Sequence, residues 1–186
     1  ASVFGDDETD YFYSIVEDNN GDYFIAGASN SFTGGTSNPN AYLVKVNTDG
    51  QEVWYNTYGA NHTQDIIEMI KITSDGLILV GSSNSDNGKE FRIIKTDSSG
   101  NEEWSKTNYS TRHNHQENAL DVIETLNNDF IFVGFSTDDG NGEPAGHIFR
   151  IDSQGNVLWS KETENVIWNI EKLDNSSVAV QRVRNL

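Results

Sequence analysis

The sequence predicts an all-β fold, a β-propeller of four-stranded antiparallel blades, on three observations. A Gly-x-x-x-Trp motif occurs three times and ends in Trp54, Trp104 and Trp159. The interval is about fifty residues, a period typical of repeat architectures such as propellers. Short β-rich runs alternate with tight turns along the chain, a pattern that indicates antiparallel strands. Helical periodicity of apolar residues is almost absent.

The first unit, about residues 4–54, contains four β-rich runs. They occupy residues 11–17, 23–27 and 41–46 and the segment that carries Trp54. The second run is apolar on both faces and is therefore expected to be a buried central strand. Short turns with Gly21 and Gly50 follow the first and third runs. A long Gly/Ser/Asn loop, residues 29–40, separates the second run from the third.

The second and third units, about residues 58–104 and 109–159, repeat this order. Their first three strands are expected at residues 66–72, 77–81 and 91–95, and at residues 119–125, 130–134 and 147–151. Loops are expected at residues 82–90, 110–117 and 136–146. The spacing of Ile66, Ile67 and Ile70 also fits a helix, but the flanking turns and the other units favour a strand.

The fourth unit, about residues 162–186, is incomplete. It has strand-like runs at residues 166–173 and 178–183, but no third strand and no Gly-x-x-x-Trp motif. Gln181 stands where the earlier units have Gly27, Gly81 and Gly134. About three and a half blades are therefore visible in a single domain or a propeller fragment.

Two versions of the propeller fit this pattern. In one, the chain is part of a larger ring and is cut within a blade at both ends. In the other, a small four-bladed ring closes when residues 1–5, which match residues 55–59, join the fourth unit. Both versions predict that a terminal strand pairs with another strand, because an open sheet edge exposes unpaired backbone groups. Self-association through the incomplete terminal blade is thus expected for the isolated chain.

A longer pattern surrounds the Gly-x-x-x-Trp motif. It reads Trp-x3-Tyr-Gly-x5-Asp, Asp-Gly, a strand that ends in Gly, Lys-x-Asp and Gly-x-x-x-Trp, and it is carried by Trp54, Tyr58, Gly59, Asp65, Asp75, Gly76, Gly81, Ser82, Ser83, Lys95, Asp97, Gly100 and Trp104. This pattern resembles the β-propeller repeats of bacterial and archaeal secreted or cell-surface proteins. It is more distantly similar to the tryptophan-docking blades of quinone-dependent dehydrogenases. The resemblance implies a propeller in an extracellular or cell-surface location and leaves the activity open, because this fold hosts many functions.

Composition excludes several classes of function. The formal net charge is −17, so nucleic acid is not an expected partner. The chain has no cysteine, which excludes disulfides and cysteine-ligated metals. No apolar run approaches the length of a membrane span, so membrane insertion is not expected.

Long loops are expected on one face of the propeller and tight turns on the other, because successive strands run in opposite directions. Functional residues concentrate on long loops held by a rigid scaffold. The loop-rich face is therefore the predicted binding face. Its candidate residues are Asp6, Asp7, Phe32, His62, Asp86, Tyr109, His113 and Asp138.

Other motifs suggest chemistry only weakly. A calcium loop is suggested by Asp138, Asp139, Asn141 and Glu143. It lacks the twelve-residue spacing of a calcium-binding loop, so no cofactor is expected, with Ca²⁺ as the open alternative. The histidines of the loops are expected to be exposed side chains rather than zinc ligands. Glycosylation triplets begin at Asn61, Asn108 and Asn175. The three repeated tryptophans are expected to pack between blades rather than to stack on sugars.

The sequence as a whole favours a non-catalytic extracellular or cell-surface propeller, acting as a structural, adhesive or protein-binding module. The expected partner is a protein or a glycan at the cell surface. A carbohydrate-binding, lectin-like propeller is one alternative, and a fragment of a propeller hydrolase or oxidoreductase is the other. No nucleophile motif, Gly-rich phosphate loop or paired-carboxylate context is recognisable.

Overall fold

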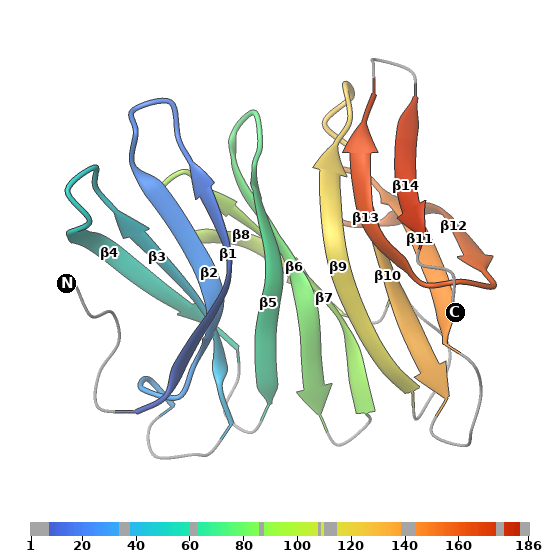
Figure 1. Cartoon of the computed structure of the whole chain (residues 1–186), viewed down its shortest axis with the longest axis horizontal. Coiled ribbons are helices and arrows are strands. Elements are labelled where there is room, and N and C mark those ends of the chain that lie inside the picture. Colours follow the sequence, from blue (N-terminus) through green and yellow to red (C-terminus); the bar gives the residue numbers. More distant parts are fainter. Residues whose placement is uncertain are drawn as a thin grey trace.

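A computed structural model describes residues 8–33, 38–59, 63–85, 88–107, 109, 115–138, 144–173 and 177–182. These residues form fourteen β-strands and no helix (Figure 1). Accordingly, none of them belongs to a helix that could span a membrane. The predicted fold class, an all-β propeller of four-stranded antiparallel blades, is confirmed.

The described residues form three complete blades and two strands of a fourth. Blade 1 contains β1 (Asp10–Glu17), β2 (Tyr23–Ser29), β3 (Asn40–Val46) and β4 (Glu52–Tyr58). Blade 2 contains β5 (Gln64–Ile72), β6 (Gly76–Ser85), β7 (Gly88–Asp97) and β8 (Glu102–Lys106). Blade 3 contains β9 (His115–Glu124), β10 (Phe130–Asp138), β11 (Ala145–Ile151) and β12 (Val157–Thr163). Blade 4 contains β13 (Ile167–Lys172) and β14 (Val178–Arg182).

Each strand pairs antiparallel with the next strand of its blade. Blades 1 and 4 lie at opposite ends of the array (Figure 1). The described residues therefore form an open array, and the four-bladed closed ring that was one of the two expected versions is not formed by them. The segment that would close it, residues 1–5, lies outside the described part of the chain.

Turns and longer connections lie at opposite ends of the blades. The β1–β2, β5–β6 and β9–β10 turns share one end, here called the turn end, and the β2–β3 and blade-to-blade connections share the other, the loop end (Figure 1). The loops are shorter than the sequence indicated. Strand β6 continues to Ser85 and β7 begins at Gly88, so most of the expected loop at 82–90 is a hairpin. Likewise β9 begins at His115 and β10 reaches Asp138, because backbone pairing continues through these polar residues.

The register of blade 4 corrects one sequence match. Ile67 of β5 faces Gly81, and the equivalent Ile167 of β13 faces Arg182 rather than Gln181. The cause is the length of the turn. The blade 2 turn is closed by a hydrogen bond from Thr73 N–H to Gly76, whereas that of blade 4 runs from Leu173 N–H to Ser177 and is one residue longer.

The hydrophobic core consists of layers between successive blades. Phe24 and Leu43 of blade 1 pack with Ile67, Ile70 and Leu79 of blade 2. The layer between blades 2 and 3 contains Ile78, Val80, Phe91, Ile93, Ala119, Val122, Phe130, Phe132, Phe149 and Ile151. The layer between blades 3 and 4 contains Ile123, Ile131, Val133, Ile148, Ile167, Ile170 and Val180. Because side chains alternate along a strand, a central strand such as β10 serves two layers and is apolar on both faces.

Candidate functional site

Most residues predicted on the loop-rich face lie outside the described part of the chain. Outside the described residues lie Asp6, Asp7, Asn61, His62, Asp86, Asn108, His113, Asp139, Asn141, Glu143 and Asn175. Asp138 was expected in a loop, but it is the last residue of β10 and pairs with His115 of β9. Within the described ranges no group of three His, Cys, Asp or Glu side chains could hold a metal ion.

The two aromatic candidates of the loop-rich face pack against the protein itself. Phe32 stacks on Tyr55, with 4.5 Å between ring centroids. Tyr109 lies edge-to-face with Phe132 at 5.1 Å, and its hydroxyl donates a hydrogen bond to the carbonyl of Gly155 at 3.3 Å. Burial raises the pKa of the Tyr109 hydroxyl. Both rings thus belong to the packing of the blades.

The repeated tryptophans connect each blade to the next through a Trp–Gly contact. Trp54 of β4 lies under the β7–β8 turn, where a Cβ on Gly100 would stand 2.6 Å from the indole. Asn56 Nδ2 and the Tyr58 hydroxyl both donate to the carbonyl of Gly100, at 3.0 and 2.7 Å. Trp104 repeats the contact one blade further, since a Cβ on Gly155 would stand 2.8 Å from its indole.

The glycine of each contact is held by an Asx turn. Gly50, Gly100 and Gly155 have φ of 73°, 78° and 76°, the left-handed region that glycine tolerates best. The Oδ1 atom of Asp97 accepts hydrogen bonds from the backbone N–H groups of Ser99 and Asn101. Bonding by the side chain and backbone of Asn101 lowers the pKa of Asp97. Asn47 and Asp152 accept the same pair of bonds in the other two turns.

The Trp–Gly contact is left open at both ends of the array. Gly50 has the same conformation as Gly100, but a Cβ on it would meet nothing within 4 Å. Trp159 is 43% exposed, and blade 4 has no described third or fourth strand to cover it. The repeated motif therefore contributes a tryptophan to the next blade and a glycine to the previous one.

Each complete blade also carries an ion pair at its turn end. The cation comes from the third strand and the carboxylate from the first turn. Lys45 Nζ lies 3.2 Å from Asp18 and 3.1 Å from Asp22, and Arg150 Nη2 lies 2.7 Å from Asp129. In blade 2 the pairs join Lys95 to Asp75 at 2.8 Å and to Glu103 at 3.1 Å. The bond from Lys95 lowers the pKa of Asp75.

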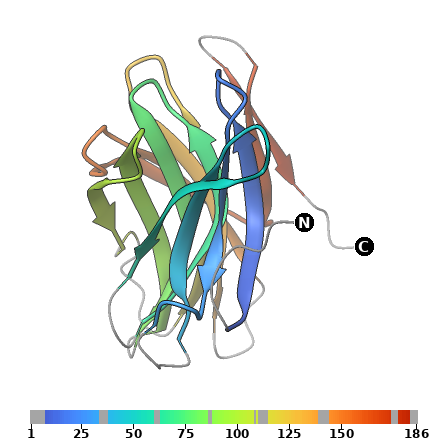
Figure 2. The ribbon, with the colours of Figure 1, turned by 90° about the vertical axis from the view of Figure 1, so that its left-hand side faces the viewer.

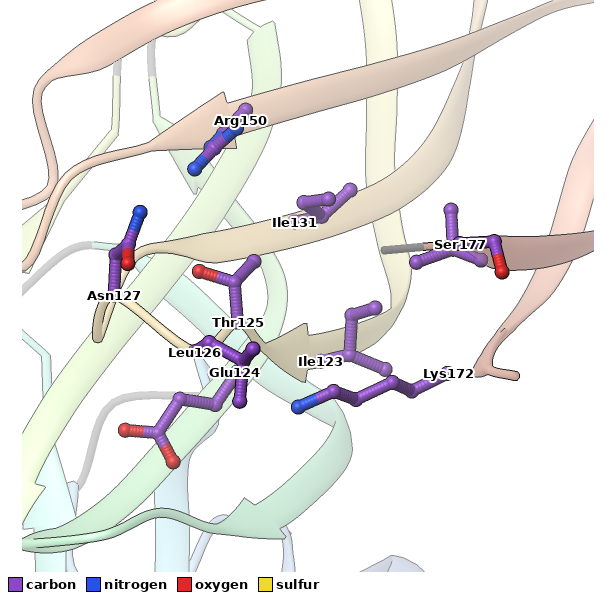
Figure 3. Close-up of a pocket in the computed structure, with 10 residues that line it drawn as sticks. Ile123, Glu124, Thr125, Leu126, Asn127, Ile131, Arg150, Lys172 and Ser177 are labelled. Carbon is purple, nitrogen blue, oxygen red and sulfur yellow. The ribbon is translucent and has the colours of Figure 1, made fainter. Parts of the chain in front are cut away.

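These ion pairs border a row of grooves between blades. The groove between blades 1 and 2 has a volume of about 560 Å³ and contains Lys45 and Trp54. The groove between blades 2 and 3, of about 390 Å³, contains the equivalent Lys95 and Trp104. Between blades 3 and 4 the volume falls to about 220 Å³, with Arg150 on one side and Lys172 on the other (Figure 3). In each groove the cation from the third strand is paired with a carboxylate of its own blade. We therefore interpret the grooves as a recurring feature of the repeat.

A polar group recurs at the loop end of every complete blade and is buried in blade 3. In blade 3 it consists of Glu117, Ser136 and His147, with 2.8 Å between Ser136 Oγ and His147 Nε2. All three side chains are less than a tenth exposed. The same register positions hold Asp65, Ser83 and Arg92 in blade 2 and Asp10, Ser29 and Tyr42 in blade 1. An acid opposite a serine is therefore a feature of the repeat.

This buried group was not recognised as a unit in the sequence. The strand register aligns Asp65 with Glu117, which faces Ser136 as Asp65 faces Ser83. Asn118 lies one position later and donates to Glu68 of blade 2 at 2.9 Å. The signal that could have revealed the group is the recurrence of a serine two residues after each strand-two glycine, at Ser29, Ser83 and Ser136.

Exposed apolar side chains gather at the two ends of the array. Blade 1 exposes Tyr11, Phe12, Tyr13, Ile15, Val53 and Tyr55. The region from blade 3 to blade 4 exposes Leu126, Val157, Leu158, Trp159, Trp168, Leu173 and Val178. In blade 2 the exposed large apolar side chain among the described residues is Ile72. Contiguous exposed apolar surface marks interaction sites.

One such candidate is the surface of blade 1 that faces away from blade 2. It is here called the back face of blade 1 and lies at the end of the array turned toward the viewer in Figure 2. Its floor is a cluster of Tyr42, Val44 and Val46 with Tyr23, Ile25 and Phe32, all from blade 1. Phe12, Ile15, Val53 and Tyr55 lie around this floor and are 38–58% exposed.

Comparison with known proteins assigns the chain to no family. No family model matches the chain. No curated protein matches it significantly. Among solved structures it is similar to the GH32 β-fructofuranosidase BmSUC1 of Bombyx mori, with a TM-score of 0.47 and 12% identity over 87% of this chain. The match spans 40% of that enzyme. At this identity the likeness assigns no role to any residue.

Proposed function

We propose that the chain is a non-catalytic propeller, outside the cell or at its surface, that binds another protein through the back face of blade 1. The observation that carries this proposal is the exposed apolar surface formed by Phe12, Ile15, Val53 and Tyr55. Such a surface is costly to leave in water, at about 25 cal/mol per Å². A protein partner that covers it would recover this free energy.

One buried acid of the scaffold, Asp121, supports a structural role. Asp121 is fully buried. Its Oδ1 accepts the backbone N–H of Val122 at 2.8 Å and lies 3.4 Å from Lys71 Nζ. Its Oδ2 accepts bonds from Asn169 Nδ2 at 2.9 Å and from the backbone N–H of Ile170 at 3.0 Å. The carboxylate thereby connects blades 2, 3 and 4, which favours a rigid scaffold.

The proposal is tested by placing a photoreactive phenylalanine analogue at Ile15, and in a matched variant at Leu126 at the other end of the array. Both positions are more than half exposed, at 58% and 60%. We expect protein adducts from position 15 and none from position 126. Adducts at neither position, in cells that produce the protein, would contradict a protein-binding role for blade 1.

Carbohydrate binding is the second candidate, and one observation favours it. Tyr11 and Tyr13 are half exposed, and their rings are stacked with 6.4 Å between centroids. Exposed aromatic rings can stack on sugars. A glycan array combined with thermal shift in calcium or zinc separates the two functions. Protein binding predicts no glycan signal and no metal shift, whereas a glycan signal that disappears in the Tyr11→Ser, Tyr13→Ser variant would favour the lectin alternative.

A further inference from the structure

We propose that Tyr11, Tyr13 and Glu68 form a binding site for the guanidinium group of an arginine side chain. The site lies on the inner edge of the array, defined here as the row of first strands β1, β5, β9 and β13, in which each strand contacts the next. It is distinct from the back face of blade 1, so this inference goes beyond the proposed function. Its residues come from blades 1 and 2, which are both complete among the described residues.

A β-bulge recurs on every first strand of the array. The pairing registers skip one residue on each strand: Tyr13 on β1, Glu68 on β5, Leu120 on β9 and Trp168 on β13. A bulge leaves its extra residue outside the ladder and re-aims its side chain, often next to an active site. The backbone feature is therefore the same in each blade, whereas the side chain that it presents differs in chemistry.

Blades 1 and 2 are joined directly beside their two bulges, which brings Tyr13 and Glu68 together. The Ser14 hydroxyl donates to Met69 Sδ at 3.3 Å and accepts the backbone N–H of Ile70 at 3.3 Å. Ser14 and Met69 each follow the bulged residue of their strand. The pKa of the Tyr13 hydroxyl is raised, first by partial desolvation and then by the negative charge of Glu68, as expected for side chains that lie near each other.

The two tyrosines present a flat aromatic surface to solvent. Tyr11 and Tyr13 are 50% and 49% exposed, and their rings are stacked with 6.4 Å between centroids and 14° between planes. A guanidinium group is planar, weakly hydrated and stacks on aromatic faces, whereas the ammonium group of lysine is a compact, strongly hydrated charge. The tyrosines therefore favour arginine over lysine.

Glu68 supplies the negative charge of the site. Its Oε1 atom accepts a hydrogen bond from Asn118 Nδ2 at 2.9 Å, which holds the half-buried carboxylate from blade 3. Its Oε2 atom makes no hydrogen bond or ion pair within the described part of the chain. A guanidinium stacked on the tyrosines could donate a charge-assisted hydrogen bond to this oxygen. The net charge of −17 adds attraction for cationic partners.

Titration of the full chain, followed by NMR of the tyrosine rings, tests the site. The probe is the peptide acetyl-Gly-Arg-Gly-amide, and its citrulline analogue has nearly the same shape without the charge. We expect the arginine peptide to shift the ring signals of Tyr11 and Tyr13 with a dissociation constant of about 1 mM, because exposed cation–π contacts are weak. The citrulline and lysine analogues should bind at least about threefold more weakly.

Two variants and a matched control assign the binding to this site. Glu68→Gln removes the charge and should weaken binding of the arginine peptide at least about threefold. Tyr13→Leu removes an aromatic face and should act alike. The control Glu17→Gln removes the same charge from an exposed position of β1 and should leave the affinity unchanged. Unchanged thermal unfolding would show that the variants are folded.

Three results would overturn the arginine site. These are ring signals of Tyr11 and Tyr13 that do not move, citrulline or lysine peptides that bind as tightly as the arginine peptide, and equal effects of Glu68→Gln and Glu17→Gln. The last result would show a general attraction to an acidic chain. The cross-linking at position 15 does not involve these side chains, so the proposed function stands or fails separately.

Discussion

Blade 2 and blade 1 are built from the same repeat but have different surroundings. Blade 2 is covered on both faces, by Phe24 and Leu43 of blade 1 and by Phe130 and Phe132 of blade 3. Blade 1 has an equally apolar back face, but among the described residues the hydrophobic cluster that forms this face consists of side chains of blade 1 alone. The comparison shows that the same sequence pattern is buried in blade 2, whereas in blade 1 its outer side chains, such as Ile15 and Val53, are exposed.

The largest expected effect is a difference in stability between two variants, one of Trp54, which the next blade covers, and one of Trp159, which is exposed. Trp54 packs on Phe24, with 5.9 Å between centroids, and on the Gly100 turn. Trp54→Ala should therefore destabilise the protein by about 3 kcal/mol, as expected for removing a packed aromatic side chain. Trp159→Ala should cost less than about 1 kcal/mol, because no following turn among the described residues covers this indole. Urea unfolding of both variants measures the difference, and equal losses would show that Trp159 is also packed.

Replacing the covered glycine, Gly100, should also cost more stability than replacing the open one, Gly50, but by a smaller difference. Gly100→Ala places a methyl group 2.6 Å from the Trp54 indole at positive φ. Backbone strain of about 1 kcal/mol and crowding of about 1–2 kcal/mol should add. Gly50→Ala should show the strain alone, since nothing lies within 4 Å. The same urea unfolding decides the matter, and a larger loss for Gly50→Ala would indicate that its turn is covered.

The smallest expected effect concerns pH. Lys95 holds the pKa of Asp75 below its usual value. A depressed pKa in the folded state contributes stability above the pKa of the unfolded chain, and this contribution is lost as pH falls through the folded pKa. Asp75→Asn should remove it at neutral pH and leave a shallower fall in melting temperature under acid. The difference should be below about 1 kcal/mol, because Asp75 is 64% exposed. Thermal unfolding between neutral pH and acid measures it, and identical pH profiles would contradict the role of the pair.

Several features of the fold could be predicted from the sequence because they depend on neighbouring residues. Tight turns at Gly21, Gly50 and Gly100 and the apolar runs between them depend on local backbone preferences and on side-chain alternation. The repeat spacing then indicated blades. Local pairing was less predictable, since β6 continues through Ser82 and Ser83, which looked like loop residues but pair with Phe91 and Glu90 of β7.

The candidate site was harder to predict, because it depends on residues far apart in the chain. Phe32 and Tyr109 looked like exposed loop aromatics, yet each ring packs on aromatic side chains from other strands. The alignment of Asp65 with Glu117 required the strand register. No spacing rule predicts this alignment, because β-bulges and turn lengths vary between blades.

The sequence by itself determined the class of the fold, the number of visible blades and the tight turns at Gly21, Gly50 and Gly100. Local steric preferences and periodicity are sufficient for these features. Only the tertiary structure decided what each copy of the Gly-x-x-x-Trp motif does. Gly100 and Gly155 receive an indole from the preceding blade, whereas Gly50 receives none. The difference lies entirely in which blade stands next to the turn, and burial is a property of the neighbour rather than of the motif.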